Sequence, residues 1–464
     1  MHAVRERLLP SQVRVGVRGG CSCTPCSCPA GNGACPVARH DSRLRHPPSG
    51  SDHPAGNGTV ALLRCPTVEA APIPHRRDLI RMIQDALLLV LFSGAVLGCL
   101  SMVVAATLVP SFARREQVAR GSEPAVTILL PLHGDEAGLF TNLVSFCNQD
   151  YSGPIQIVLG VGDRHDPAIH VLERLRDAFP GRRLELVVNA YPAGSNPKVA
   201  NLVAMSSRIE HDIIVLADSD IRVEPGHLRR VVGALDPSGR GAVTCPYFGI
   251  SIGNPWSQLA RLGVDAHFLP GIMLGVRLGL ARPCLGSTIC MSRDSLAAIG
   301  GFEAVANCLA DDHALGEALR KRGETVVLLP FAVGHICSEA SWRELWLHEV
   351  RWALTIRTID PVGYAGWSIG HAFPLALAAV CLGGGLPACA LAAAALACRA
   401  VLVRAIERGY DLPAHSYWLI PVRDLLSFAV LIAGFAGRNV SWKGRRFRVL
   451  AGGGPILDRG ATLE

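Results

Sequence analysis

The sequence is poor in charged and in aromatic residues. Of its 464 residues, 18% are charged and 6% are aromatic, whereas 50% are hydrophobic. Soluble domains carry roughly a quarter charged residues, so part of this chain is expected to lie in a bilayer. Disorder, collagen and a small disulfide scaffold are excluded for the bulk of the chain. The sequence has no basic stripe interleaved with aromatic residues, so we do not expect it to bind nucleic acid. The net charge of +7 instead favours contact with an anionic membrane surface.

Three further features are absent: a signal peptide, internal repeats and a disulfide framework. Six of the sixteen cysteines fall before residue 66, and the others are scattered singly through apolar stretches. A scattered cysteine in an apolar run is usually a small buried hydrophobic residue. The main body is therefore expected to be reduced or embedded in a membrane.

Residues 1–81 differ in composition from everything that follows. They are rich in Arg, Gly, Pro, Ser, His and Cys, and the run Cys21-Ser-Cys-Thr-Pro-Cys-Ser-Cys28 has thiols spaced closely enough for zinc or copper(I). The favoured interpretation is a disordered or mis-assigned leader, because Met82 opens a hydrophobic segment as a start codon would. A Cys-rich membrane metal-binding protein is the alternative of another class.

Apolar segments flank a central region of globular composition. Residues 86–109 are 24 uncharged residues, enough to cross about 30 Å of hydrocarbon as a helix. Arg114, Arg115 and Arg120 follow, and the positive-inside rule then places the next region in the cytoplasm. Residues 367–403 are broken at 383–387 by Gly-Gly-Gly-Leu-Pro, which predicts a helical hairpin.

A last apolar segment, residues 417–436, contains Arg423 and Asp424. Three C-terminal spans would put the basic tail outside the cytoplasm, so this segment is our candidate for a re-entrant one. The predicted organisation is a leader (1–81), a transmembrane helix (84–110), a catalytic domain (124–365) with an interfacial helix (341–358), C-terminal transmembrane helices (367–436) and a basic tail (437–464).

The central region alternates short apolar runs with amphipathic ones. The runs predict buried strands at Val126–Leu130, Ile155–Leu159, Leu184–Val188 and Ile213–Leu216, with helices near 136–148, 167–179 and 197–208. Such alternation is typical of a parallel α/β sheet with helices on both faces. Ligands in these folds bind at the carboxyl ends of the strands.

Acidic residues follow two of these strands. Asp218-Ser-Asp220 ends a buried strand, and Mg²⁺ commonly binds one or two carboxylates together with substrate phosphates; a turn cap is the alternative. Asp163 follows the run Ile155–Val161 and is the better ligand candidate there, because Asp166-Pro suits a helix start.

Two more clusters lie further along the chain. Asp311 and Asp312 open a helical pattern, where acids suit the helix dipole, but adjacent carboxylates can also raise one pKa and create a general base. His348-Glu-Val-Arg351-Trp352 falls in an amphipathic stretch whose tryptophans and arginines fit a membrane interface. The Arg351 guanidinium also suits a diphosphate.

These four clusters, in this order, resemble the ceramide glucosyltransferase-like members of glycosyltransferase families 21 and 2, including the hopanoid-associated enzymes of bacteria. That family has three aspartate motifs and a final Gln-or-Arg-x-x-Arg-Trp motif. Asp163, Asp218 and Asp312 match the aspartates, and His348-x-x-Arg351-Trp352 matches the last motif except at His348. Asn196-Pro-Lys198-Val-Ala-Asn and Ser-Trp-Lys-Gly-Arg-Arg-Phe-Arg near the C-terminus match too. Asp220 and Asp311 favour the bacterial branch.

The resemblance implies a GT-A fold, a Rossmann-like α/β domain flanked by transmembrane helices. It implies an inverting hexosyltransferase that moves a sugar, N-acetylglucosamine or glucose, from a UDP-sugar to a hydroxyl of a membrane lipid, a hopanoid or a ceramide-like lipid. Asp312 would be the catalytic base, supported by His348 and by Asp311, which we assign to capping the helix and to tuning the pKa of its neighbour. Asp218 and Asp220 would hold Mg²⁺ or Mn²⁺, and the nucleotide sugar would contact Asp163, Lys198, Asp218, Arg351 and Trp352.

The resemblance also implies a multi-pass protein of the bacterial inner membrane with its catalytic domain in the cytoplasm. A polysaccharide synthase of the processive family 2 type is the alternative within the enzymes. Such a synthase usually needs more membrane helices than the roughly four apolar spans counted here.

Overall fold

The computed structural model describes residues 76–113, 123–189 and 194–437, and the backbone of three short strands after them. The chain divides into Met1–Pro72 and Ile73–Glu464, and every described element belongs to the second unit. The Cys21–Cys28 run lies outside the described residues. So do Arg114, Arg115 and Arg120, on which the predicted orientation depends.

A seven-stranded sheet forms the centre of the catalytic region, in the order β3-β2-β1-β4-β8-β6-β9. The four strands that the sequence predicts are present and mutually parallel. β8 is antiparallel to both of its neighbours, and β9 is parallel to β6. The strands are β1 (Val126–Pro131), β2 (Ile155–Val161), β3 (Arg183–Val188), β4 (Ile213–Leu216), β6 (Ala242–Thr244), β8 (Ile289–Ser292) and β9 (Val326–Leu328).

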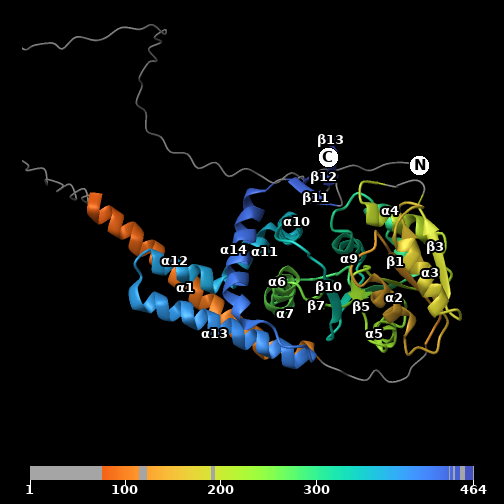
Figure 1. Cartoon of the computed structure of the whole chain (residues 1–464), viewed down its shortest axis with the longest axis horizontal. Helices are drawn as coiled ribbons and strands as arrows, with labels where there is room; N and C mark the ends of the chain where they lie inside the picture. The colour runs from red at the N-terminus through yellow and green to blue at the C-terminus, as the bar shows by residue number, and fades with distance from the viewer. Residues whose placement is uncertain are drawn as a thin grey trace, which may run out of the picture. The chain divides into compact units, whose positions relative to one another are not determined.

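Helices cover both faces of this sheet, as predicted (Figure 1). Successive residues of a strand point to opposite faces, and in β1 the side chains of Ile128 and Leu130 join one buried cluster while Leu129 joins the other. The first cluster includes α2 (Leu139–Cys147), α3 (Ala168–Ala178) and α5 (His227–Gly233). The second includes α4 (Pro197–Ser206), α8 (Arg293–Ala298), the 3₁₀ turn η2 (Phe302–Val305) and α9 (Asp311–Lys321).

A small second sheet stands at the carboxyl end of β4. Its order is β5-β10-β7, with β5 (Ile221–Arg222) antiparallel and β7 (Tyr247–Ser251) parallel to the central β10 (Val333–Cys337). Because β5 begins directly after Asp220, this sheet fixes the loop that carries the two acids.

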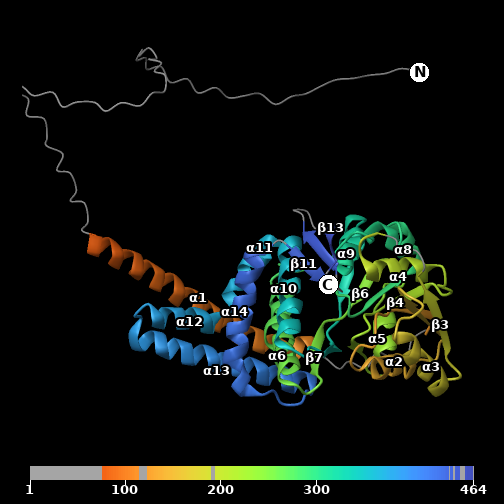
Figure 2. The same cartoon turned by 45° about the horizontal axis from the view of Figure 1, so that its top comes forward.

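The remaining helices form an apolar assembly beside the α/β domain (Figure 2). α1 packs lengthwise against α13, and also contacts α12 and α7. The predicted hairpin is present, and Gly383 and Gly385 make its turn with φ of 84° and 63°, values open to glycine. The helices are α1 (Arg76–Phe112), α6 (Pro255–Gly263), the π-helical turn η1 (Val264–Phe268), α7 (Leu269–Arg277), α10 (Trp342–Ile359), α11 (Pro361–Gly366), η3 (Trp367–Gly370), α12 (Ala372–Cys381), α13 (Gly385–Tyr410), η4 (Tyr417–Leu419) and α14 (Ile420–Ala436).

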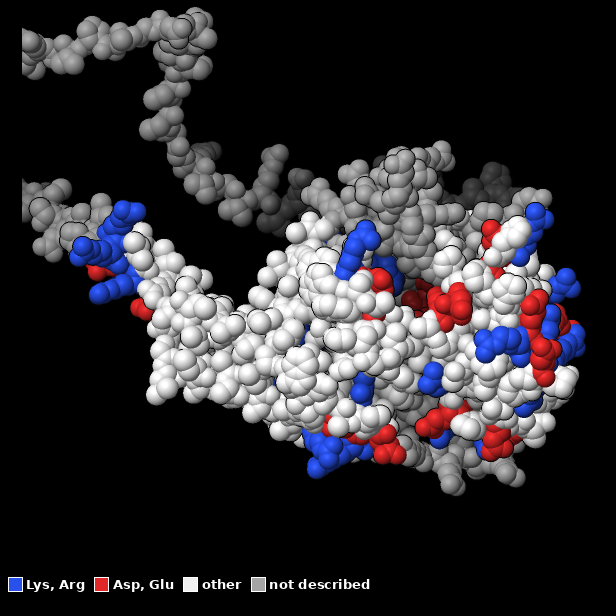
Figure 3. All heavy atoms as spheres, in the orientation of Figure 1, with Lys and Arg blue, Asp and Glu red and all other residues white. Residues whose placement is uncertain are grey.

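Four helices in the described part of the chain are long and apolar enough to cross a membrane. They are α1, the continuous α6–η1–α7 segment at Pro255–Arg277, α13 and the η4–α14 segment at Tyr417–Ala436; α11–η3 and α12 form a further pair, bent by 65°. The helix at 255–277 was not among the spans predicted from the sequence. The first arm of the predicted hairpin is the 10-residue α12, which passes the test for a span only together with α11–η3. Figure 3 shows little charge along the middle of the helical assembly, whereas charged side chains gather at the start of α1 and again at the lower edge of the assembly.

The two charges of α14 lie inside the protein. The Arg423 guanidinium forms a two-pronged ion pair with Glu349 of α10. Asp424 Oδ1 lies 3.0 Å from both Arg399 Nε of α13 and His267 Nε2 of η1. Charges within apolar helices generally face a partner in the protein interior, so this pairing accounts for both residues. In Figures 1 and 2 α14 crosses the direction of α1 and α13. The re-entrant arrangement stays a prediction.

The C-terminal segment predicted only as a basic tail forms a three-stranded antiparallel sheet. Its strands are β11 (Asn439–Trp442), β12 (Arg445–Val449) and β13 (Pro455–Thr462).

Candidate active site

The Asp218-Ser219-Asp220 turn is held from three sides at the end of β4. The Asp218 N–H donates to the carbonyl of Gly286 at 3.1 Å. The Asn142 side-chain amide donates to the Ser219 carbonyl at 3.1 Å, and the Ser219 hydroxyl donates to Glu136 at 2.6 Å. These contacts leave Asp218 and Asp220 partly exposed, as expected for ligand-binding acids.

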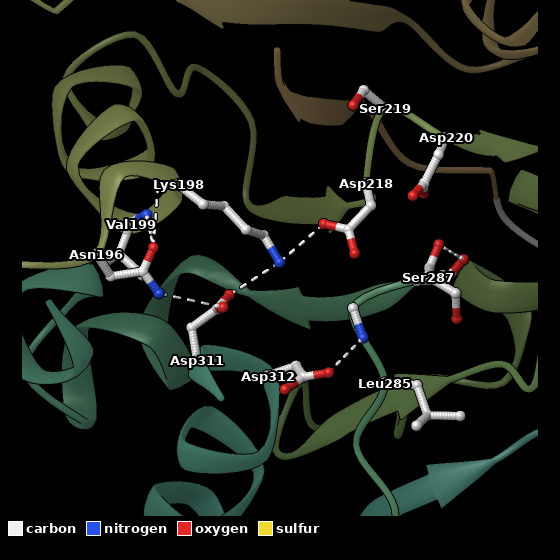
Figure 4. A network of polar contacts seen from close by, with 12 residues as sticks. Asn196, Lys198, Val199, Asp218, Ser219, Asp220, Leu285, Ser287, Asp311 and Asp312 are labelled. Carbon is white, nitrogen blue, oxygen red and sulfur yellow. Dashed lines mark hydrogen bonds and ion pairs between the residues drawn. The ribbon is translucent and has the colours of Figure 1, made fainter. Parts of the chain in front are cut away.

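Lys198 joins two of the predicted acidic clusters. Its ammonium lies 2.8 Å from Oδ1 of Asp218 and 2.9 Å from Oδ2 of Asp311 (Figure 4). Burial by itself would lower the pKa of Lys198, but Asp218 and Asp311 together raise that pKa well above its usual value. The ammonium is therefore always charged and fixes the distance between β4 and α9.

The Asn196-Pro-Lys198 motif sets the position of that ammonium. Asn196 is the N-cap of α4, and its side-chain oxygen accepts the N–H groups of Lys198 and Val199 at 3.0 and 3.2 Å. Its amide nitrogen donates to the Cys308 carbonyl at 2.8 Å. The cap thus ties the first turn of α4 to the segment that precedes Asp311.

Asp311 and Asp312 have different environments. Asp311 is buried against Lys198, whereas Asp312 Oδ2 accepts the N–H of Gly286 at 2.9 Å. Burial and the neighbouring Asp311 raise the pKa of Asp312 to about 6. The helix-capping role expected for Asp311 is wrong, because Ala310 is the N-cap of α9 and it is Asp312 that accepts a backbone N–H of the first turn, that of His313. Asp311 instead pairs with the buried cation.

Gly286 stands where β4, α4 and α9 meet. A Cβ at this position would lie 2.7 Å from Oδ2 of Asp218 and 3.2 Å from Nζ of Lys198. Only glycine lets the backbone approach both groups while its N–H reaches Asp312. The segment before β8 is therefore part of the site.

His335 is a site residue that the sequence analysis did not identify. It lies on β10, with Nδ1 3.7 Å from Oδ2 of Asp220. The ring is buried, burial lowers its pKa, and Nδ1 has no hydrogen-bond partner among the described residues. Partial removal of its carboxylate from water and the nearby Asp218 raise the pKa of Asp220 to about 7. The sequence offers only a lone histidine in an apolar run, which is a weak signal.

The Asp220–His335 pair fits a divalent metal. A neutral imidazole and a carboxylate are common ligands for such ions, and a bound cation would favour the ionised form of Asp220. Within the described ranges no group of three His, Cys, Asp or Glu side chains is arranged to hold a metal. The remaining ligands would therefore come from substrate oxygens and water, as is usual for Mg²⁺.

Helix α10 brings the last predicted motif to the same place. The charges of Asp220 and Asp218 act on Arg351, although burial, the largest effect, lowers the pKa of that guanidinium to about 10. The ring of Trp352 lies 5.8 Å from that of His335 and 4.6 Å from that of His348. His348 Nδ1 is 2.5 Å from Oε1 of Glu339, so a carboxylate orients this imidazole.

Two residues of the expected arrangement lie elsewhere. Asp163 is exposed beyond β2, where the His165 N–H donates to its carboxylate and lowers its pKa; no contact found among the described residues joins it to Lys198 or Asp218.

Arg357, one of the arginines of the predicted interfacial helix, donates to the carbonyls of Phe435 and Gly437 at 2.7 Å. It binds the C-terminal end of α14, and Arg351 and Trp352 turn toward the site.

The parallel β3-β2-β1-β4 sheet with acids beyond β4 and on α9, together with the family match, defines a glycosyltransferase of the GT-A fold. The chain belongs to Glycosyl transferase family 21, whose model matches residues 90–454. The resemblance seen in the sequence is thereby confirmed at the level of the family.

Individual relatives match shorter stretches. Ceramide glucosyltransferase 1 of Caenorhabditis elegans is 27% identical over 205 residues, 43% of each chain. A ceramide glucosyltransferase of Komagataella phaffii is 35% identical over 117 residues, 24% of this chain and 23% of that one. The chain therefore spans less than half the length of the curated relatives it matches.

Solved structures show more distant likenesses. Mannosyltransferase PcManGT from Pyrobaculum calidifontis, in complex with GDP-Man and Mn²⁺, has a TM-score of 0.45 at 19% identity over 76% of this chain and 98% of that one. Glucosyl-3-phosphoglycerate synthase from Mycobacterium tuberculosis has a TM-score of 0.33 at 16% identity over 50% and 78%. These values are too low for a residue-by-residue comparison.

Proposed function

We propose that this protein is a membrane-bound inverting hexosyltransferase that moves a sugar from a UDP-sugar to a hydroxyl of a membrane lipid. The observation that carries the proposal is the convergence of Asp218, Asp220, Asp312 and Arg351, which come from three separate elements, at the carboxyl end of β4. Ligands of α/β sheets bind at this edge.

The donor diphosphate is expected beside Asp220, His335 and Arg351. A divalent metal held by Asp220 and His335, with Asp218 close by, would neutralise charge on the leaving diphosphate. Arg351 would contribute a second cation whose planar fork suits phosphate oxygens. Trp352 packs against His335 and so holds this side of the site in place. Asp163, which lies apart from these groups beyond β2, is proposed to contact the nucleotide, and Lys198 is proposed to help seat it through its ion pair with Asp218.

Asp312 is the proposed catalytic base. A lipid hydroxyl is a poor nucleophile at neutral pH, so its proton must leave as its oxygen attacks the anomeric carbon. The Asp312 carboxylate takes that proton, the new carbon–oxygen bond forms, and the bond from the sugar to the diphosphate breaks with release of UDP. A pKa of about 6 leaves Asp312 mostly ionised at pH 7 but more basic than an ordinary aspartate. This single displacement inverts the anomeric configuration.

The acceptor is proposed to be a lipid because apolar helices α1, α13 and α14 adjoin the domain that carries these residues. A ceramide-type lipid and a hopanoid polyol are the two candidates, with glucose or N-acetylglucosamine as the sugar. The named curated relatives are ceramide glucosyltransferases, which supports the ceramide type. The bacterial features, Asp220 and the Asp311–Asp312 pair, support the hopanoid.

One assay tests the function. Membranes containing the full chain are incubated with labelled UDP-glucose and UDP-N-acetylglucosamine, and lipid products are identified by mass spectrometry. We expect a single glycolipid that is absent with Asp312→Asn. A long polymer would support the polysaccharide synthase instead, and no product from either donor with ceramide or hopanoid would contradict the proposal.

We further propose that the protein lies in the bacterial inner membrane with its catalytic domain in the cytoplasm. Arg76, Arg77 and Arg81 flank the other end of α1, so positive residues occur on both sides and the orientation needs a direct test. Protease should cleave within residues 124–365 in cytoplasm-out vesicles; protection there would contradict the orientation. Removal of residues 1–81 should leave sugar transfer intact. Loss of sugar transfer in this truncated protein would favour a metal-binding role of the leader.

A further inference from the structure

Two leucines are presented to solvent at the end of α7. Leu278 is 65% exposed and Leu280 is 76% exposed, and the turn they occupy runs from Arg277 to Arg282. We refer to residues 277–282 as the apolar turn. Scattered single leucines on a surface are ordinary, but these two leucines share one turn.

The backbone of the apolar turn is fixed. The Leu278 N–H donates to the Leu274 carbonyl at 2.9 Å, and the N–H groups of Leu280 and Ala281 donate to the Gly275 carbonyl at 2.8 and 3.0 Å. Gly279 between the leucines has φ of 69°, which completes this helix end. The exposure of the two leucines is therefore built into the fold.

The apolar turn is continuous with the membrane-spanning part of the protein. It directly follows α7, whose Leu269 and Met273 are buried in one cluster with Met102, Ala105 and Val109 of α1. α1 is one of the helices that could span a membrane. A turn attached to such a helix lies where an apolar side chain can reach lipid.

The charges around the leucines fit an anionic lipid surface. Arg277 and Arg282 are both exposed and bracket the leucines in the sequence. Arginine near a bilayer is attracted to anionic headgroups while apolar neighbours enter the acyl boundary. Two exposed leucines between two exposed arginines therefore match the surface of an anionic bilayer better than they match water.

The same segment runs directly to the proposed base. Leu285 is anchored by its N–H to Oγ1 of Thr244 at 3.0 Å, and the next N–H, that of Gly286, donates to Asp312. Gly286 is six positions after Leu280, so their Cα atoms are at most about 22 Å apart. A bilayer surface that holds the leucines would thus lie close to the base.

We propose that the apolar turn inserts Leu278 and Leu280 into the surface of an anionic bilayer and thereby sets the distance between lipid hydroxyls and Asp312. The proposal rests on the proposed function for its link to catalysis, but the insertion itself is independent of activity. The occupant of this surface is the membrane, and a protein partner would be a different outcome of the test.

Insertion is measured by fluorescence quenching in the full chain. Leu280→Cys carries an environment-sensitive probe in a background where the exposed Cys381 and Cys389 and any other reactive thiols are serine. The protein is placed in phosphatidylcholine–phosphatidylglycerol vesicles that contain lipids with a nitroxide near the headgroup. Val327→Cys is the matched control, since Val327 is 42% exposed on the edge strand β9.

We expect the nitroxide lipids to quench the probe at 280 and to leave the probe at 327 bright. Equal fluorescence at both positions would overturn the proposal. Protection of position 280 from both the lipid quencher and aqueous iodide would indicate a protein partner and would overturn it too. The quenching assay does not depend on catalysis. A protein that shows quenching at position 280 but has no transferase activity would contradict the proposed function and still support the membrane contact.

A kinetic comparison then tests the link to catalysis. Leu278→Ser combined with Leu280→Ser should raise KM for a bilayer acceptor about tenfold or more, since two leucines no longer leave water. Transfer to a short-chain, water-soluble acceptor should stay within about twofold of wild type, as should all rates of Val327→Ser. A similar loss with both acceptors would show that the leucines merely support the fold and would contradict the proposed link.

Discussion

Lys198 and Asp311 form a buried ion pair, with 2.9 Å between Nζ and Oδ2. The pair decides how two adjacent aspartates divide their roles. Asp311 is held by a cation and by the Asn196 amide, whereas Asp312 accepts backbone N–H groups from Gly286 and His313. Asp312 has a raised pKa and contacts Gly286, in the segment that follows the apolar turn.

Asp312→Asn should abolish most turnover while it leaves donor binding near normal. The substitution keeps the size of the side chain and removes its basicity, and loss of a general base costs on the order of 10²–10⁴ in rate. Asp311→Asn is the matched control and should be milder in turnover. Steady-state kcat and UDP-sugar affinity of the two variants decide the matter. An inactive Asp311→Asn beside an active Asp312→Asn would move the base by one residue.

The dependence of kcat/KM on pH should report Asp312. The base works in its ionised form, so activity should fall as pH drops below about 6, the pKa that burial and Asp311 give it. Asp311→Asn removes the repulsion that raises this pKa, and the acidic limb should then move to lower pH. Burial, the larger cause, remains, so the shift should be partial. If the acidic limb of the pH profile does not move in Asp311→Asn, a group other than Asp312 causes the loss of activity at low pH.

Removal of divalent metal should abolish transfer, and Mn²⁺ or Mg²⁺ should restore it. Asp220→Asn and His335→Ala should weaken Mn²⁺ binding by at least about ten- to a hundred-fold, the usual cost of disturbing even the outer groups of a metal site. His170→Ala, an exposed histidine on α3, is the control. Electron paramagnetic resonance of free Mn²⁺ measures binding without activity. Full activity in EDTA would exclude this assignment.

Arg351→Lys should raise KM for the donor and lower kcat/KM by about tenfold or more. Lysine keeps the charge but loses the planar fork that matches two phosphate oxygens. Arg343→Lys on the exposed side of the same helix should behave as wild type. If both variants equal the wild type, Arg351 does not contact the donor.

Arg423→Met should destabilise the protein by about 3–5 kcal/mol, because it leaves the Glu349 carboxylate buried without its cation. The double variant with Glu349→Met should recover much of this loss. Thermal unfolding in detergent measures both. Equal stability of the single and double variants would show that Glu349 finds water or another partner when Arg423 is absent.

The sequence was informative where a feature is local. Hydrophobic runs identified the four mutually parallel strands β1 to β4, and the glycines at 383–385 marked the hairpin turn. The acids at 218, 220 and 312 became candidates because each follows a strand or opens a helix, and the structure brings them to the same edge of the sheet.

Features that depend on partners far apart in the chain could not be predicted from the sequence. His335 becomes a candidate ligand only because β10 pairs with β5, which follows Asp220. Asp311 was assigned to a cap because its partner Lys198 lies more than a hundred residues earlier in the chain. The apolar helix 255–277 was hidden by its place between strands β7 and β8 of the catalytic region.

The packing of α1 against α12 and α13 also has a consequence for synthesis. Gln84 of α1 donates to the Leu382 carbonyl at 2.7 Å, and the Tyr410 hydroxyl donates to the Phe112 carbonyl at 2.9 Å, each pair 298 positions apart. A ribosome delivers the first of these helices long before the others. Since membrane helices insert first and associate afterwards, α1, which is long and apolar enough to cross a membrane, can meet α12 and α13 only after the catalytic region between them has been translated. The two halves of the bundle should therefore also assemble when they are produced as separate polypeptides in one cell.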